Sequence, residues 1–166
     1  MASDTDRIVR KILLRAPRER VWNAISDSRQ FGTWFGAQFN DRFAPGKSVH
    51  GKIVGTTVDA EVAARQKPHA DKVFEFAIDR IEPQRLFSYR WHPYAVEPGI
   101  DYSKEPMTLV VFELEDAPNG TMLTVTESGF DRIPVERRAR AFERDSEGWT
   151  MQMTLIEKYL AAHPEG

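Results

Sequence analysis

The chain begins with an alternation of apolar and polar residues that gives way to helical spacing. Residues 7–14 place every second side chain on an apolar face and are rich in β-branched types, which predicts a β-strand. Pro17 ends this strand and stands where the first turn of a helix tolerates a proline. Asp27 can cap a second short helix, whose length Gly36 limits. We therefore expect one strand followed by two short helices.

The middle of the chain keeps a period of two through six further segments, as antiparallel strands with one buried face do. These segments are 49–53, 58–64, 74–78, 87–91, 110–114 and 123–127. The run Pro118-Asn119-Gly120, between the last two, is typical of a tight hairpin turn. Together with residues 7–14, they predict an antiparallel sheet of about seven strands.

From Pro134 to about Leu160 the spacing is helical again, and one apolar stripe runs along the whole segment. The stripe consists of Val135, Ala139, Phe142, Ser146, Trp149, Met153, Ile156 and Leu160. The opposite face is expected to be solvated and carries Glu136, Arg137, Arg140, Glu143, Arg144 and Glu147. Gly148 costs such a helix about 1 kcal/mol relative to alanine. We favour close packing of a strand against the helix as its explanation, the alternative being room for a ligand beside Trp149.

These elements form one unit, because no repeat, low-complexity tract or linker interrupts residues 1–166. The fold class is α+β, with a curved antiparallel sheet around a long C-terminal helix and two short helices after the first strand. A single helix is only about 10 Å wide and cannot cover the apolar face of such a sheet alone. The uncovered part must be closed by the short helices and loops, or remain as a pocket.

Composition narrows the classes of partner and chemistry. The chain has 23 basic and 25 acidic residues, so its net charge of −2 gives no general reason to expect binding to nucleic acid. Cysteine is absent, which excludes disulfides, thiolate metal sites and a cysteine nucleophile. The polar N-terminus lacks the features of a secretory signal, and no apolar run approaches about 20 residues. We expect a cytoplasmic protein that does not insert into membranes.

The inward positions of the predicted sheet and helix carry many aromatic rings, and an apolar wall with few polar groups suits a small-molecule site. The predicted cavity residues are Trp34, Phe35, Phe39, Phe74, Phe76, Phe87, Tyr89, Trp91, Phe112, Glu127, Trp149 and Met153. The alternative for each ring is packing within an ordinary core.

Two residues are candidates for acid–base chemistry. Glu127 continues the inward parity of its strand and could orient a ligand or move a proton, unless it pairs structurally with an arginine or a backbone group. His92 could act as an acid or base at the mouth of the cavity, unless it is an exposed loop residue. None of the four histidines has metal-ligand spacing, and hydrolase and phosphate-loop motifs are absent. We therefore expect no metal and no other cofactor.

Several segments, taken in order, carry a resemblance to a known family. They are Ala16-Pro17 followed by Val21-Trp22, then 31–35, 85–91, 124–130 and Gly148-Trp149. They resemble bacterial homologues of the heat-shock-protein-90 ATPase activator, which belong to the START-like, or SRPBCC, superfamily. The resemblance covers about residues 7–161 and implies a helix-grip, or Bet v-like, fold with a deep cavity between the sheet and the C-terminal helix. It implies no single function, since relatives are similar to lipid-binding, hormone-binding and polyketide-cyclase proteins.

Three functions are compatible with these expectations. The first is binding of an apolar or amphipathic small molecule, such as a lipid, polyketide or aromatic metabolite, with a stress-related or regulatory role. The second is a cyclase, hydratase or dehydrogenative enzyme that uses Glu127 with His92 or Tyr89. The third is a chaperone partner that activates an ATPase. The loop 92–106, with Tyr94, Val96, Ile100 and Tyr102, is expected to form a lid or a contact with a second copy in a homodimer.

Overall fold

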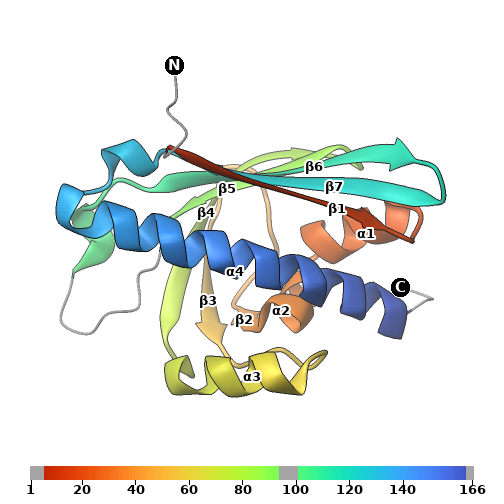
Figure 1. The fold of residues 1–166 in the computed structure, drawn as a ribbon, viewed down its shortest axis with the longest axis horizontal. Helices are drawn as coiled ribbons and strands as arrows, with labels where there is room; N and C mark the ends of the chain where they lie inside the picture. Colours follow the sequence, from red (N-terminus) through yellow and green to blue (C-terminus); the bar gives the residue numbers. More distant parts are fainter. Residues whose placement is uncertain (1–5, 94–100, 164–166) are drawn as a thin grey trace.

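The computed structural model of the protein describes residues 6–93 and 101–163, and it contains a seven-stranded antiparallel sheet that curves around a long helix (Figure 1). The strands are β1 (Arg7–Leu14), β2 (Ala37–Phe39), β3 (Ser48–Ile53), β4 (Val73–Glu82), β5 (Leu86–Trp91), β6 (Thr108–Ala117) and β7 (Gly120–Ser128). The helices are α1 (Arg18–Ser26), α2 (Ser28–Phe35), α3 (Ala60–Gln66) and α4 (Val135–Ala162), with 3-10 turns at Lys67–His69, Tyr102–Lys104 and Phe130–Arg132. The strand order is β1-β7-β6-β5-β4-β3-β2, and α4 lies across the sheet (Figure 1). The expected helix-grip fold is confirmed.

The ends of the early elements follow from local chemistry. Pro17 stands at the N-cap of α1, where its missing N–H costs nothing. The Asp27 side chain accepts a hydrogen bond from the Arg29 amide (3.0 Å) and so caps α2. Gly36 ends α2 with a φ of 97°, a conformation that favours glycine. The predicted strand and pair of short helices are therefore confirmed.

The prediction of a strand at 58–64 is wrong, because these residues form most of α3. The Asp59 side chain accepts a hydrogen bond from the Val62 amide (3.0 Å), which is an N-cap that a strand could not use. The alanines that follow favour a helix, and two residues of the apparent alternation, Ala60 and Ala64, are exposed. The seventh strand is instead β2, a short segment at the edge of the sheet next to β3.

The first turns of α4 also differ from the expected stripe. Val135 is 73% exposed and Ala139 is exposed, whereas Arg137 and Ala141 are buried. The solvated face expected for Arg137 is therefore wrong. A strict repeat of seven residues drifts around a straight helix, so the stripe that fits the C-terminal half does not extend to the N-terminus. From Trp149 onward the predicted positions are buried as expected.

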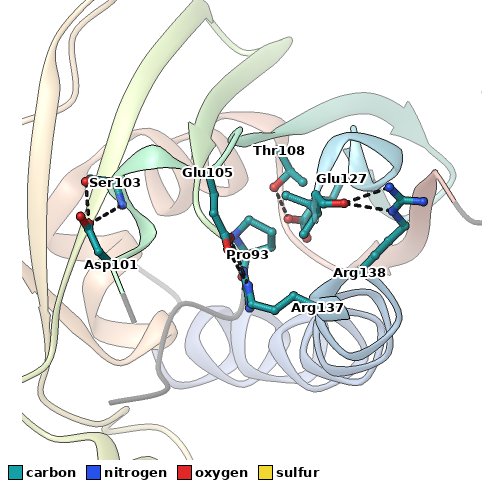
Figure 2. Close-up of polar contacts among 9 residues, drawn as sticks. Pro93, Asp101, Ser103, Glu105, Thr108, Glu127, Arg137 and Arg138 are labelled. Carbon is teal, nitrogen blue, oxygen red and sulfur yellow. Dashed lines mark hydrogen bonds and ion pairs between the residues drawn. The ribbon is translucent and has the colours of Figure 1, made fainter. Parts of the chain in front are cut away.

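Arg137 is buried because an acidic partner and a backbone carbonyl surround it. Its guanidinium donates to both carboxylate oxygens of Glu105 at 2.8–3.1 Å and to the Pro93 carbonyl at 3.0 Å (Figure 2). It also lies 4.6 Å from the centroid of the Tyr102 ring. These contacts fasten the segments on both sides of residues 94–100 to α4. The lid or contact expected of Tyr94, Val96 and Ile100 lies outside the described residues.

A cluster of aromatic rings fills the interior between α2 and the middle of the sheet. Phe31 is at its centre, with ring centroids 4.6–6.5 Å from those of eight other aromatic residues. Trp34 closes the cluster toward α1, where its Nε1 donates to the Ala24 carbonyl at 2.9 Å. Burial of each such ring stabilises the fold by about 1.5–3 kcal/mol. Much of the space under α4 is therefore packed core.

The helices of the described residues include none with the length and apolar character needed to cross a bilayer.

Candidate functional site

A cavity of about 470 Å³ remains beside this core, between the middle of α4 and the parts of the sheet nearest α3. Besides α4, the end of α2, the start of β2, the C-terminal end of β3, the α3 region, the start of β4 and the end of β5 surround it. The lining residues are Phe35, Gly36, Ala37, Ile53, Arg65, Gln66, His69, Lys72, Val73, Phe74, Trp91, His92, Arg144, Asp145, Glu147, Gly148, Met151 and Gln152. The sheet is thus wider than the helix that crosses it, as the sequence argument requires.

The walls of the cavity divide by polarity. Phe35, Phe74, Trp91 and Met151 form an apolar surface that connects with the aromatic core. The α3 side and one turn of α4 carry basic groups, among them Arg65, which bonds to Glu61 at 3.0 Å. A small molecule with an apolar body and a polar end would match such a surface.

Gly148 gives the cavity its depth on the α4 side. A Cβ atom built at this position would meet no heavy atom within 4 Å outside the neighbouring helix backbone. The favoured explanation, close packing of a strand, is therefore wrong, and the alternative of open space beside Trp149 describes the site. A recess of about 70 Å³ lies here, lined by Phe35, Trp91, Asp145, Gly148, Trp149 and Gln152.

Glu127 lies behind the recess and is 0% exposed, in agreement with its predicted inward parity. Its Oε2 accepts from Trp91 Nε1 (2.8 Å) and from the Thr108 hydroxyl (2.5 Å; Figure 2), and its Oε1 accepts from Trp149 Nε1 (2.8 Å). All three partners are neutral side-chain donors. Pairing with an arginine or a backbone group, the alternative considered for Glu127 in the sequence analysis, is not observed among the described residues. These three donors satisfy the buried carboxylate of Glu127.

Asp145 is a candidate site residue that the sequence reasoning missed. It lines the cavity, and its buried Oδ2 has no donor among the described residues. Burial, the charge of Glu127 and a hydrogen bond with Glu127 together hold the pKa of Asp145 well above its usual value, while Arg137 opposes the shift. The protonated form of Asp145 is therefore favoured beside Glu127. Its position four residues before Trp149, on the same helix face, is the signal that could have identified it.

His92 and Tyr89 occupy different surroundings. His92 lines the cavity and is half-buried, with Nδ1 buried and without a partner among the described residues. Burial lowers the pKa of His92 despite the nearby Glu75 and Glu105, so the ring is neutral at pH 7. Tyr89 is fully buried in the core against Phe76, and burial with the charges of Glu127 and Asp145 raises its pKa. The structure therefore brings Tyr89 close to the carboxyl pair, while His92 lies at the cavity wall.

The other predicted residues fall into two groups. Phe35, Phe74 and Trp91 line the cavity and Trp149 lines the recess. The rest belong to the packed core or lie against it and do not line this cavity: Trp34, Phe39, Phe76, Phe87, Phe112 and Met153. Within residues 6–93 and 101–163, no three histidine or acidic side chains are grouped to hold a metal ion.

Comparisons with known proteins agree with this geometry. Residues 15–161 match the family model described as activator of Hsp90 ATPase homolog 1-like protein. Similar solved structures include a protein from Arthrobacter aurescens (18% identity, TM-score 0.73, covering 96% of this chain and 90% of that chain) and one from Mesorhizobium loti (20%, 0.68, 94% and 97%). The Aha1 dimer from Colwellia psychrerythraea is also similar (14%, 0.65, 93% and 95%). No curated protein matches the sequence significantly. The chain belongs to the activator of Hsp90 ATPase homolog 1-like family, within the START-like superfamily.

Proposed function

We propose that this protein binds an apolar or amphipathic small molecule in the cavity between the sheet and α4. The observation that carries the proposal is Gly148, a mid-helix glycine that no neighbour requires and that opens space toward an aromatic wall. Glycine in a helix costs about 0.5–1 kcal/mol relative to alanine. A binding site explains why a destabilising glycine is present here, whereas close packing does not, because no neighbour approaches the position.

The dimensions and chemistry of the cavity support the same proposal. Its volume of about 470 Å³ falls within the range of about 300–1,000 Å³ that is usual for small-molecule sites. Phe35, Phe74, Trp91 and Met151 supply an apolar surface, and polar side chains lie at its margins. A lipid fragment, a polyketide or an aromatic metabolite would fit this combination.

The test is to fill the cavity from the helix side. The Gly148→Leu variant should bind the uncharged apolar dye N-phenyl-1-naphthylamine at least tenfold more weakly than the unmodified protein, measured by dye fluorescence. Ala139→Leu is the matched control, because it adds a leucine to an exposed position of the same helix and should leave dye binding unchanged. Native mass spectrometry of the purified protein should detect a co-purified small molecule. Equal dye affinity in both variants would contradict the proposal.

A second candidate function is activation of a chaperone ATPase, which the family description and the similar Aha1 dimer favour. In this case the outer surface would carry the activity, and Gly148→Leu would leave it intact. The test is the ATPase rate of a bacterial Hsp90 with and without the protein. Light scattering that gives twice the 19.0 kDa mass of one chain would support a homodimer.

Proton chemistry is a third candidate function. The residues that favour it are the carboxyl pair of Glu127 and Asp145, and not His92. A cyclase or hydratase needs a proton donor in its site, and the raised pKa of Asp145 favours the protonated form of that carboxyl. Turnover of a substrate by the Asp145→Leu variant would exclude this role for the pair.

A further inference from the structure

The wall of the cavity contains buried polar atoms that have no hydrogen-bond partner among the described residues. Gln152 is only 8% exposed, and its Nε2 donates to the Phe35 carbonyl at 3.4 Å, which orients Oε1 as an acceptor. That Oε1 is buried and has no partner among the described residues, and the same holds for His92 Nδ1. Both residues line the cavity. Buried acceptors are rarely left unpaired in native proteins, so a ligand that donates hydrogen bonds would complete the site.

The basic groups at the mouth are already engaged. Arg65 bonds to Glu61 at 3.0 Å, and Lys72 Nζ lies 3.0 Å from His69 Nδ1. Arg144 and Lys72 also have further interactions. An anionic ligand would have to compete for these cations, whereas a donor would meet Gln152 unopposed.

The carboxyl pair behind the recess also disfavours an anion. Glu127 carries a charge that no described basic side chain contacts directly, and Asp145 forms part of the recess wall. A carboxylate placed there would bring oxygen acceptors against oxygen acceptors, next to a like charge. A hydroxyl or amide N–H would bring complementary groups together.

We propose that the ligand presents an O–H or N–H donor to Gln152 Oε1 and His92 Nδ1 while its apolar body lies against Phe35 and Trp91. The inference rests on the proposed binding function and names the ligand class: phenols, alcohols and amides with an apolar body, as against carboxylates. The neutral ring of His92 can accept from such a donor in one tautomer.

The experiment compares three probes with the same ring system: naphthalene, 2-naphthol and 2-naphthoate. Titrations followed by tryptophan fluorescence should show that 2-naphthol binds about tenfold more tightly than naphthalene, equal to about 1.4 kcal/mol, and that 2-naphthoate binds most weakly. Gln152→Leu should reduce the affinity for 2-naphthol to that for naphthalene. The naphthalene affinity of this variant should stay unchanged and serves as the check that its cavity is intact.

Two further variants secure the interpretation. His92→Phe removes the second acceptor and should also weaken 2-naphthol selectively, which keeps the test open if Gln152→Leu does not fold. Glu157→Gln, at an exposed position of α4, is the matched control and should leave all three affinities unchanged.

The possible failures are distinguishable. If naphthalene binds and 2-naphthol gains nothing, the donor-seeking site is wrong and the binding function stands. If 2-naphthoate binds most tightly, the basic mouth selects the ligand and the inference is overturned. If none of the three probes binds, the proposed binding function fails together with the inference.

Discussion

At the scale of single residues, Asp145 lies in surroundings that disfavour its charged form. Its carboxyl is placed against that of Glu127, whose own hydrogen bonds to Trp91, Trp149 and Thr108 fix it in place. A buried acid of this kind reduces stability wherever the unfolded chain would ionise it. Such a cost is common at sites that bind or react.

The Asp145→Asn variant tests this arrangement. Because the pKa of Asp145 is raised by folding, its favourable contribution is complete below the unfolded value of about 3.8 and is lost as the pH rises through the folded value. Asparagine keeps the shape, can donate to Glu127 and does not titrate. We expect the variant to be more stable at pH 7, because it removes the cost of holding a titrating carboxyl against Glu127. Urea unfolding from pH 4 to 8 checks this, and a difference that does not grow with pH would contradict it.

Glu127→Gln should destabilise the protein by about 2–3 kcal/mol, because three donors lose a charged acceptor and the new amide N–H₂ group faces other donors. Urea unfolding at pH 7 measures the loss. Glu113→Gln is the control, since Glu113 is exposed on β6 and should change stability by less than about 0.5 kcal/mol. Equal stability of the two variants would show that the Glu127 network contributes little.

The sequence allowed the prediction of Glu127 but not of Asp145. Parity along β7 places Glu127 inward, since every second residue of a strand shares a face. Asp145 acquires its role from a contact between α4 and β7, which no local pattern contains. The deep rings were predicted to point inward and do so, but which of them face open space depends on side-chain packing that the sequence does not state.

At the scale of elements, α4 packs one face against the core while its middle lines the cavity. The C-terminal half buries Trp149, Ile156 and Leu160 against the core, while Gly148 leaves the helix backbone open to the cavity. We therefore explain the glycine at position 148 by the open space of the cavity and not by close packing against a neighbouring element.

Gly148→Ala should raise the free energy of unfolding by about 0.5–1 kcal/mol, because alanine favours the helix and its Cβ meets no neighbour. Thermal unfolding should show a correspondingly higher midpoint. A lower midpoint would mean that the glycine is needed for packing after all.

The ion pair between Arg137 and Glu105 ties α4 to the chain before β6, and both side chains are largely buried, at 9% and 13% exposure. Arg137→Ala should destabilise the protein by about 3 kcal/mol, because it leaves the Glu105 charge unpaired. The double variant Arg137→Met, Glu105→Leu should recover most of that loss. Denaturant unfolding of both variants is the measurement, and a double variant no more stable than the single one would contradict this account.

The predictions of individual elements failed where a short sequence pattern is compatible with both a strand and a helix. The alternation of Val58, Ala60 and Val62 suits a strand, but the Asp59 cap decides for a helix. The seventh strand is β2, which is only three residues long. A segment this short has no clear alternation in the sequence, so only the structure identifies it as a strand. The longer strands and the hairpin at Asn119 were correct because their patterns extend over many residues.

At the scale of the whole molecule, a sheet wider than one helix leaves space that is divided into two parts. The aromatic cluster around Phe31 fills the part near α2, and the cavity occupies the part near α3. The first part stabilises the curved sheet, so the second can stay open without loss of the fold. The proposed binding function depends on this division of the interior into a packed part and an open part.

Tryptophan indole N–H signals in a proton–nitrogen NMR spectrum test this division most directly. The chain has four tryptophans: Trp91 lines the cavity, Trp149 lines the recess, and Trp22 and Trp34 do not line either. On titration with 2-naphthol, we expect the signals of Trp91 and Trp149 to shift and those of Trp22 and Trp34 to stay in place. If all four signals stay unchanged, or if only Trp22 and Trp34 respond, the cavity under α4 is not the binding site.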